Sequence, residues 1–285
     1  MITNTTFSLS GKHGKSIYGD LTFLNNRQAK PILIFCHGYK GFKDWGAWQL
    51  IAKAFAEAGF CFVKFNFSHN GVKIDNPTEF TDLDAFGNDN YTKQLDDLNS
   101  VIDFFEHENE FSSEIDFTQL ALVGHSRGGG IVLLQANEDV CVKQVITWAG
   151  VSDFGIRFPK GKKLEDWKNQ EVYYIVNGRT KQKMPHFIQF YEDFLFNQKQ
   201  LHIKTAVKEL KKPLLIVHGT NDDAVQNWEA EAIFNHAENA TIKWIANANH
   251  VFGMSHPWQD NQLPSHAKLL SKSTIAFLQK NNPNI

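Results

Sequence analysis

Short runs of apolar residues alternate along this chain with longer stretches in which apolar residues recur every three or four positions. The short runs predict strands buried on both faces of a sheet, and the longer stretches predict amphipathic helices. We expect strands at residues 31–36, 60–67, 120–123, 144–148, 213–217 and 241–246, and helices at 45–58, 91–107, 226–237 and 263–280, with one more after residue 128. This alternation predicts an α/β fold with a mostly parallel twisted sheet and helices on both faces.

The amino-terminal residues follow a different period. Residues 2–10 and 16–24 alternate apolar and polar side chains, with Gly11 and Gly14 between them. This period predicts an antiparallel hairpin at an edge of the sheet. Residues 68–89 are rich in Asn, Asp and Gly and predict a long polar loop.

Residues 151–212 interrupt the alternation of strands and helices. An apolar run at 171–176 meets Asn177-Gly178, which predicts a tight hairpin with a second arm at 179–184, and helical stretches follow near 186–197 and 201–210. The block is too long for an ordinary connection. We therefore expect a cap at 151–212 inserted into a core domain formed by 1–150 and 213–285.

Composition narrows the class of protein. The 285 residues carry a formal net charge of −2 without a long single-sign run, which disfavours a nucleic-acid partner. The three cysteines have no pair spacing and indicate thiols in a reducing compartment: Cys36, Cys61 and Cys141. No secretory signal is visible, and no run approaches the roughly 20 apolar residues of a membrane span. These features predict a cytoplasmic protein without membrane association.

A G-x-S-x-G pattern lies between a predicted strand and a predicted helix. It spans Gly124–Gly128, and the apolar run 120–123 precedes it. In this context the pattern predicts a sharp turn that raises the Ser126 hydroxyl above the sheet edge. A side chain at either flanking glycine would collide with the neighbouring strand or helix. Ser126 is therefore the candidate nucleophile.

A serine nucleophile needs a base, and the base needs an acid that orients it, in the chain order Ser, acid, His. Asp222 follows the strand at 213–217 and is the favoured acid, with Asp223 and the less favoured Asp153 as alternatives. His250 follows the strand at 241–246 and is the favoured base, with His256 as the alternative.

The same chemistry needs backbone N–H groups that stabilise an oxyanion. One is expected from Arg127, directly after the nucleophile, and the other from the loop after residue 36, where Tyr39 is favoured. The histidines of the chain are scattered over separate loops without metal-ligand spacing, so we expect no metal site.

These motifs make the chain resemble an α/β-hydrolase over nearly its whole length. The resemblance is to prolyl-oligopeptidase-like and dienelactone-hydrolase-like esterases, including cinnamoyl (feruloyl) esterases with a hairpin-bearing cap. It rests on residues 37–46, 65–68, 124–130, 218–222 and 249–253. The resemblance implies a triad of Ser126, Asp222 and His250, with oxyanion donors at Tyr39 and Arg127. Dienelactone hydrolases use Cys where this chain has Ser126, so their activity is not implied.

We thus predict a serine carboxylic-ester hydrolase that needs no cofactor and acts on a small ester, with an aryl or hydroxycinnamoyl acyl group as one option. A peptidase or amidase and a non-catalytic binding protein on a hydrolase scaffold are the alternatives. Trp167 and other aromatics of the cap either line an acyl pocket or pack the cap onto the core. The candidate pocket residues are Phe42, Trp148, Tyr173, Tyr174 and Phe252.

Overall fold

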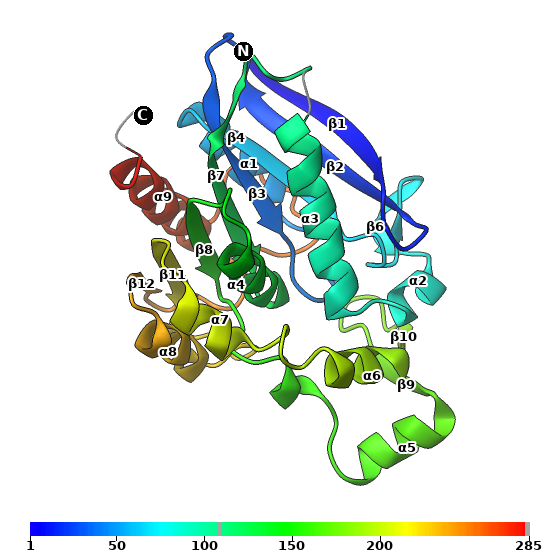
Figure 1. Ribbon diagram of the computed structural model, residues 1–285. Helices are drawn as coiled ribbons and strands as arrows, with labels where there is room; N and C mark the ends of the chain where they lie inside the picture. Colours follow the sequence, from blue (N-terminus) through cyan, green and yellow to red (C-terminus); the bar gives the residue numbers. More distant parts are fainter. Residues whose placement is uncertain (108–109, 283–285) are drawn as a thin grey trace.

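An eight-stranded sheet forms the centre of the computed structural model, which describes residues 1–107 and 110–282 (Figure 1). Its strand order is β1-β2-β4-β3-β7-β8-β11-β12. The strands are β1 (Ile2–Ser10), β2 (Ser16–Leu24), β3 (Lys30–Cys36), β4 (Cys61–Asn66), β7 (Ile115–His125), β8 (Gln144–Trp148), β11 (Leu214–Gly219) and β12 (Ala240–Ile245). The strands from β4 to β12 pair in parallel, and β2 is antiparallel to both of its neighbours, β1 and β4. The predicted fold class and the predicted edge hairpin are confirmed.

Helices cover both faces of the sheet and enclose two hydrophobic clusters. One cluster holds apolar residues of α3 (Tyr91–His107), α4 (Arg127–Glu138), α7 (Ile203–Glu209) and α8 (Asn227–His236). The other holds those of α1 (Trp48–Glu57) and α9 (Ser265–Lys280). The central strands read as unbroken apolar runs because both of their faces are covered. Each fully buried large apolar side chain contributes about 1.5–3 kcal/mol to this packing.

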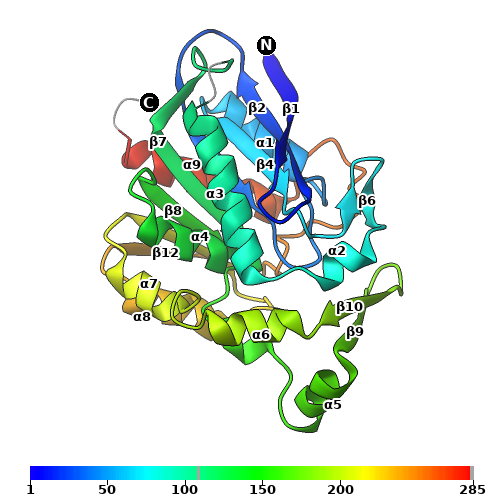
Figure 2. The same cartoon turned by 45° about the vertical axis from the view of Figure 1, so that its right-hand side comes forward.

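The segment 151–212, which we call the cap segment, connects the neighbouring strands β8 and β11. It contains the 3-10 turn η1 (Gly155–Arg157), α5 (Lys162–Gln170), the antiparallel strands β9 (Val172–Val176) and β10 (Lys183–Phe187), α6 (Gln189–Phe196) and α7. In Figures 1 and 2, α5, the hairpin and α6 lie beyond one end of the sheet. The end of the segment returns to the core, where α7 packs against α4 and α8.

One local prediction was wrong, and one helix of the cap segment was missed. Residues 68–89 are not a plain loop, since they contain β5 (Val72–Lys73), β6 (Asn76–Phe80) and α2 (Leu83–Gly87). Phe80 and Phe86 in this region are buried against Phe42 and Met184, a tertiary contact that local polarity hides. Helix α5 was not predicted because Trp167 is its single buried residue, so it lacks an apolar stripe.

The hairpin of the cap segment also differs from its prediction. Strand pairing stops at Val176 and Lys183, so the connection is longer than the two-residue turn expected from Asn177-Gly178. The Asn177 side chain instead accepts a hydrogen bond from the Arg179 N–H at 3.0 Å, which closes a local Asx turn. Among the helices that the structure describes, none is long and apolar enough to cross a membrane.

Candidate active site

Ser126 lies in the turn between β7 and α4. Its backbone has φ 55° and ψ −119°, a conformation that costs a non-glycine residue about 1–3 kcal/mol. The turn holds because its neighbours have no side chain. A Cβ at Gly124 would lie 2.2 Å from the Gly128 carbonyl oxygen, and one at Gly128 would lie 2.3 Å from that of Cys36. The expected collisions are thus present, one with the helix start and one with the end of β3.

The loops after β11 and β12 bring Asp222 and His250 together. His250 Nδ1 donates to Asp222 Oδ2 at 2.8 Å, and the Asp222 side chain is fully buried. The other carboxylate oxygen, Oδ1, accepts the N–H groups of Ala224 and Val225, each at 2.9 Å. Burial alone would raise the pKa of Asp222, but the hydrogen bond and charge of His250 outweigh it and hold the pKa below its ordinary value. The proton on Nδ1 leaves Nε2 of His250 free to accept one.

Backbone contacts hold these two loops in register. The Asn221 N–H donates to the Ala248 carbonyl at 3.0 Å, and a Cβ at Gly219 would lie 2.3 Å from the same oxygen. His125 Nε2 contacts the His250 carbonyl at 2.9 Å. Burial lowers the pKa of His125 to about 3, so this ring is neutral and donates that bond. We did not predict this role of His125, although its place inside the G-x-S-x-G pattern was a signal.

Two backbone N–H groups beside Ser126 have no acceptor within the described residues: those of Tyr39 and Arg127. The loop that carries Tyr39 approaches the serine closely, since a Cβ at Gly38 would lie 2.8 Å from Ser126 Cβ. Such a close approach requires glycine at position 38. The Tyr39 and Arg127 N–H groups thus lie on two segments that meet beside Ser126.

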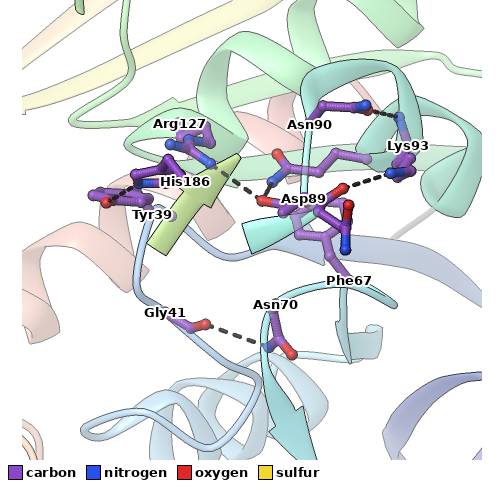
Figure 3. Close-up of polar contacts among 12 residues, drawn as sticks. Tyr39, Gly41, Phe67, Asn70, Asp89, Asn90, Lys93, Arg127 and His186 are labelled. Carbon is purple, nitrogen blue, oxygen red and sulfur yellow. Dashed lines mark hydrogen bonds and ion pairs between the residues drawn. The ribbon is translucent and has the colours of Figure 1, made fainter. Parts of the chain in front are cut away.

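His37 and Asn70 support the Tyr39 loop from behind. His37 Nδ1 donates to the Gly38 carbonyl at 2.9 Å, and its Nε2 accepts the Phe67 N–H at 3.3 Å. The Asn70 amide donates to the Gly41 carbonyl at 3.4 Å (Figure 3). Burial lowers the pKa of His37 to about 4, which keeps the ring neutral in this role. Asn70 was not predicted for this role, because it lies in the stretch expected to be loop.

The Arg127 side chain extends into a buried polar cluster. Its Nη1 lies 3.3 Å from Asp89 Oδ2, and its guanidinium lies 4.2 Å from the ring centre of Tyr39 (Figure 3). Burial raises the pKa of Asp89 to about 6, against the opposing effect of Arg127. The Tyr39 hydroxyl and His186 Nε2 are 2.6 Å apart, which joins this loop to β10 of the cap segment.

Ser126 and His250 line two cavities. The larger one, which we call the cap cavity, has a volume of about 650 Å³, and the smaller one, the core cavity, about 400 Å³. Of the predicted pocket residues, Tyr173 lines the cap cavity and Phe42 lines the core cavity. The cap cavity is also lined by aromatic side chains that were not predicted for it or only weighed: Tyr39, Tyr91, Phe158, Trp167 and Phe190.

The other three predicted pocket residues line neither cavity. Trp148 has an exposed fraction of 0% and packs on Phe35 and Trp48, because β8 is a central strand covered on both faces. Phe252 is also 0% exposed, in the cluster beneath α1 and α9. Tyr174 is 55% exposed, because neighbouring residues of a strand point to opposite faces and Tyr173 takes the inward one.

The alternative acids and base have other contacts. Asp223 is exposed, and its carbonyl accepts the Gln226 amide at 3.2 Å. Asp153 is exposed, and its Oδ1 accepts the Gly155 N–H at 2.6 Å. His256 lines the core cavity, and its Nδ1 accepts the Gly46 N–H at 3.0 Å. Within the described residues, no group of three or more His, Cys, Asp or Glu side chains could hold a metal ion.

Comparison with known proteins decides the family. The model of the alpha/beta hydrolase family matches residues 33–260. The chain belongs to this family. No curated protein matches it.

Solved structures share the fold of this alpha/beta hydrolase at low sequence identity. The esterase domain of a Rhodothermus marinus protein is 18% identical with a TM-score of 0.65, and the match covers 98% of each chain. Est1E from Butyrivibrio proteoclasticus with ferulic acid bound is 17% identical with a TM-score of 0.70, over 96% of this chain and 98% of that one. A dienelactone hydrolase from Anabaena variabilis is 16% identical with a TM-score of 0.62, over 98% of each chain.

Proposed function

We propose that this alpha/beta hydrolase is a serine carboxylic-ester hydrolase. The observation that carries the proposal is the hydrogen bond from His250 to the buried Asp222 carboxylate, in a site where His250 and Ser126 line the same cavities. A serine, an imidazole and a carboxylate are the groups that nucleophilic acyl transfer needs, and the chain carries them in the order Ser126, Asp222, His250.

The proposed reaction proceeds through an acyl-enzyme. His250 Nε2 takes the Ser126 proton while Oγ attacks the ester carbonyl, and the Tyr39 and Arg127 N–H groups stabilise the oxyanion. The alcohol leaves with the proton from His250. Water, activated by the same imidazole, then attacks the acyl-enzyme and releases the acid. Asp222 holds the imidazole in the tautomer that each step requires and stabilises the imidazolium.

The acyl group occupies the cap cavity in this proposal. Six aromatic side chains line that cavity, which favours a flat apolar acyl group such as an aryl or hydroxycinnamoyl one. The likeness to Est1E with ferulic acid bound agrees with this substrate class. We also propose that the cap segment acts as a separate cap over the core domain. The three free cysteines favour a reducing, cytoplasmic location.

Labelling by a fluorophosphonate tests the proposed nucleophile. We expect the wild-type enzyme to be labelled once and to hydrolyse 4-nitrophenyl butyrate, and Ser126→Ala to lose both properties while it melts as the wild type does. Ser152→Ala is the matched control, because Ser152 lines neither of the two cavities.

Unlabelled wild type without esterase activity would refute the proposal. Comparable rates on an aryl ester and its anilide would favour an amidase instead.

A further inference from the structure

Positive charge is concentrated in the wall of the cap cavity. Four cationic side chains line it: Lys40, Arg127, Arg157 and Lys163. In the part of the chain that the structure describes, no Asp or Glu lines this cavity. The chain as a whole has a formal net charge of −2, so this imbalance is local and does not reflect composition.

Carboxylates behind the wall neutralise the two arginines. Arg127 pairs with Asp89, and its guanidinium also stacks on aromatic rings. Arg157 Nη2 lies 2.5 Å from Glu229 Oε1, and Glu229 is buried. Arg157 thus contacts both carboxylate oxygens of Glu229, and Arg127 contacts one oxygen of Asp89, so each arginine already has a carboxylate partner.

The two lysines have no such partner. Neither ammonium forms an ion pair or a hydrogen bond with any described residue, and Lys40 contacts only the Tyr39 ring, at 5.3 Å from its centre. Partial burial, with the nearby Arg127 charge, lowers the pKa of Lys40. An anion in the cavity would relieve both effects, because it would replace lost hydration and offset the neighbouring positive charge.

Of the two histidines that line this cavity, His250 belongs to the proposed triad, and His186 does not compete for an anion. Burial lowers the pKa of His186 to about 3, so its ring is neutral near pH 7 and is held by the Tyr39 hydroxyl. The unpaired ammonium groups of the wall are those of Lys40, next to Tyr39 in the chain, and of Lys163, at the start of α5 in the cap segment.

We propose that the acyl group of the substrate carries a carboxylate in addition to the scissile ester, and that Lys40 and Lys163 bind it. The proposal rests on the proposed function, since it assigns the acyl group to the cap cavity. The aromatic side chains contact the body of such an acyl group, and two single ammonium groups suit a monoanion. A phosphate would instead favour the planar guanidinium group of an arginine, and both arginines of the wall already have carboxylate partners.

A matched substrate series tests this proposal. Its members are 4-nitrophenyl half-esters of linear dicarboxylic acids from glutaric to sebacic, each compared with the same ester ending in a primary amide. We expect, for at least one chain length, kcat/KM about tenfold higher for the carboxylate than for the amide. This ratio should fall as salt is raised, because both lysines are partly exposed to solvent.

Two neighbouring lysines on α5 provide a matched pair of variants. Both are exposed, but Lys163 lines the cavity and Lys162 does not. We expect Lys163→Gln to lower the carboxylate-to-amide ratio about fivefold and Lys163→Glu to bring it below one, while Lys162→Gln leaves it unchanged. Lys40→Gln should lower the ratio by a similar factor.

The outcomes separate the two proposals. Hydrolysis of the amide-ended esters at rates equal to or above those of the carboxylates, at every length, would overturn this inference and leave the ester hydrolase standing. An equal effect of Lys162→Gln and Lys163→Gln on the ratio would also overturn it. Absence of both hydrolysis and fluorophosphonate labelling would remove the proposed function, and this inference with it.

Discussion

The core side of the candidate site and the cap segment differ in how tightly their residues are packed. Ser126, Asp222 and His250 lie on loops that directly follow strands of the central sheet. Strand β11, which leads to Asp222, is buried along its whole length, whereas β9 in the cap segment alternates between half-buried and exposed residues. Packing on both faces constrains the strands from which the core loops start, and the cap hairpin is constrained mainly from one side. The proposed chemistry therefore lies where positions are held tightly, and the proposed substrate selection lies where side chains can vary.

Several polar contacts join the two regions, and one of them lies beside the candidate site. The Tyr39 hydroxyl contacts His186, and within the cap segment the Trp167 indole N–H donates to the His186 carbonyl at 2.9 Å. The Tyr39 loop is thereby tied to β10 and, through His186, to α5. If the core side of the site is held more tightly than the cap segment, variants of the core loops should remove activity or stability. Variants at the junction between Tyr39 and His186 should change both only slightly.

The largest effect is expected at Asp222. Asp222→Asn should lower kcat about 10⁴-fold, because an amide fails to hold His250 in the required tautomer. Asp223→Asn is the matched control and should retain near-wild-type kcat, since that side chain is exposed. Steady-state kinetics on 4-nitrophenyl butyrate provide the measurement. A larger loss in Asp223→Asn than in Asp222→Asn would contradict the assignment of the acid.

A smaller effect, on stability, is expected when a side chain is added in the turn between β7 and α4. Gly128→Ala should lower the free energy of unfolding by about 3 kcal/mol, because its Cβ would meet backbone at 2.3 Å and the strand end cannot move aside. Gly178→Ala in the cap hairpin is the control, since a Cβ there has no neighbour within 4 Å. Urea unfolding measures the stability of both variants. Equal stabilities would refute the expectation that the turn at Ser126 is packed more tightly than the cap hairpin.

The smallest effect is expected at the junction. Tyr39→Phe removes the hydroxyl that bonds His186 and should cost about 1 kcal/mol of stability, because one buried hydrogen bond is lost. The Tyr39 N–H is retained, so kcat should fall no more than a few fold. Denaturation and kinetics on aryl and alkyl esters would show this, and a loss of kcat as large as in Asp222→Asn would mean that the cap controls the chemistry.

Strong local patterns made much of the fold and the candidate site predictable. The buried strands, the edge hairpin and α3 have apolar periods long enough to decide their structure, and β1, β2, α3 and β8 have the predicted bounds. Ser126 could be identified because a strand, a turn that requires glycine and a helix leave little choice of backbone. The placement of Asp222 and His250 after strands followed from the parallel sheet, whose strand ends meet at one edge.

Tertiary structure alone decided the rest. Trp148, Phe252 and Tyr174 are as aromatic as Tyr173 in the sequence, but only the packing of the sheet and the face of the hairpin determine which of them reaches a cavity. His125, His37 and His186 became neutral supporting groups through burial, which no local pattern reports. The unpaired charges of Lys40 and Lys163 are likewise a property of the fold, because residues more than a hundred positions apart line one cavity without a carboxylate between them.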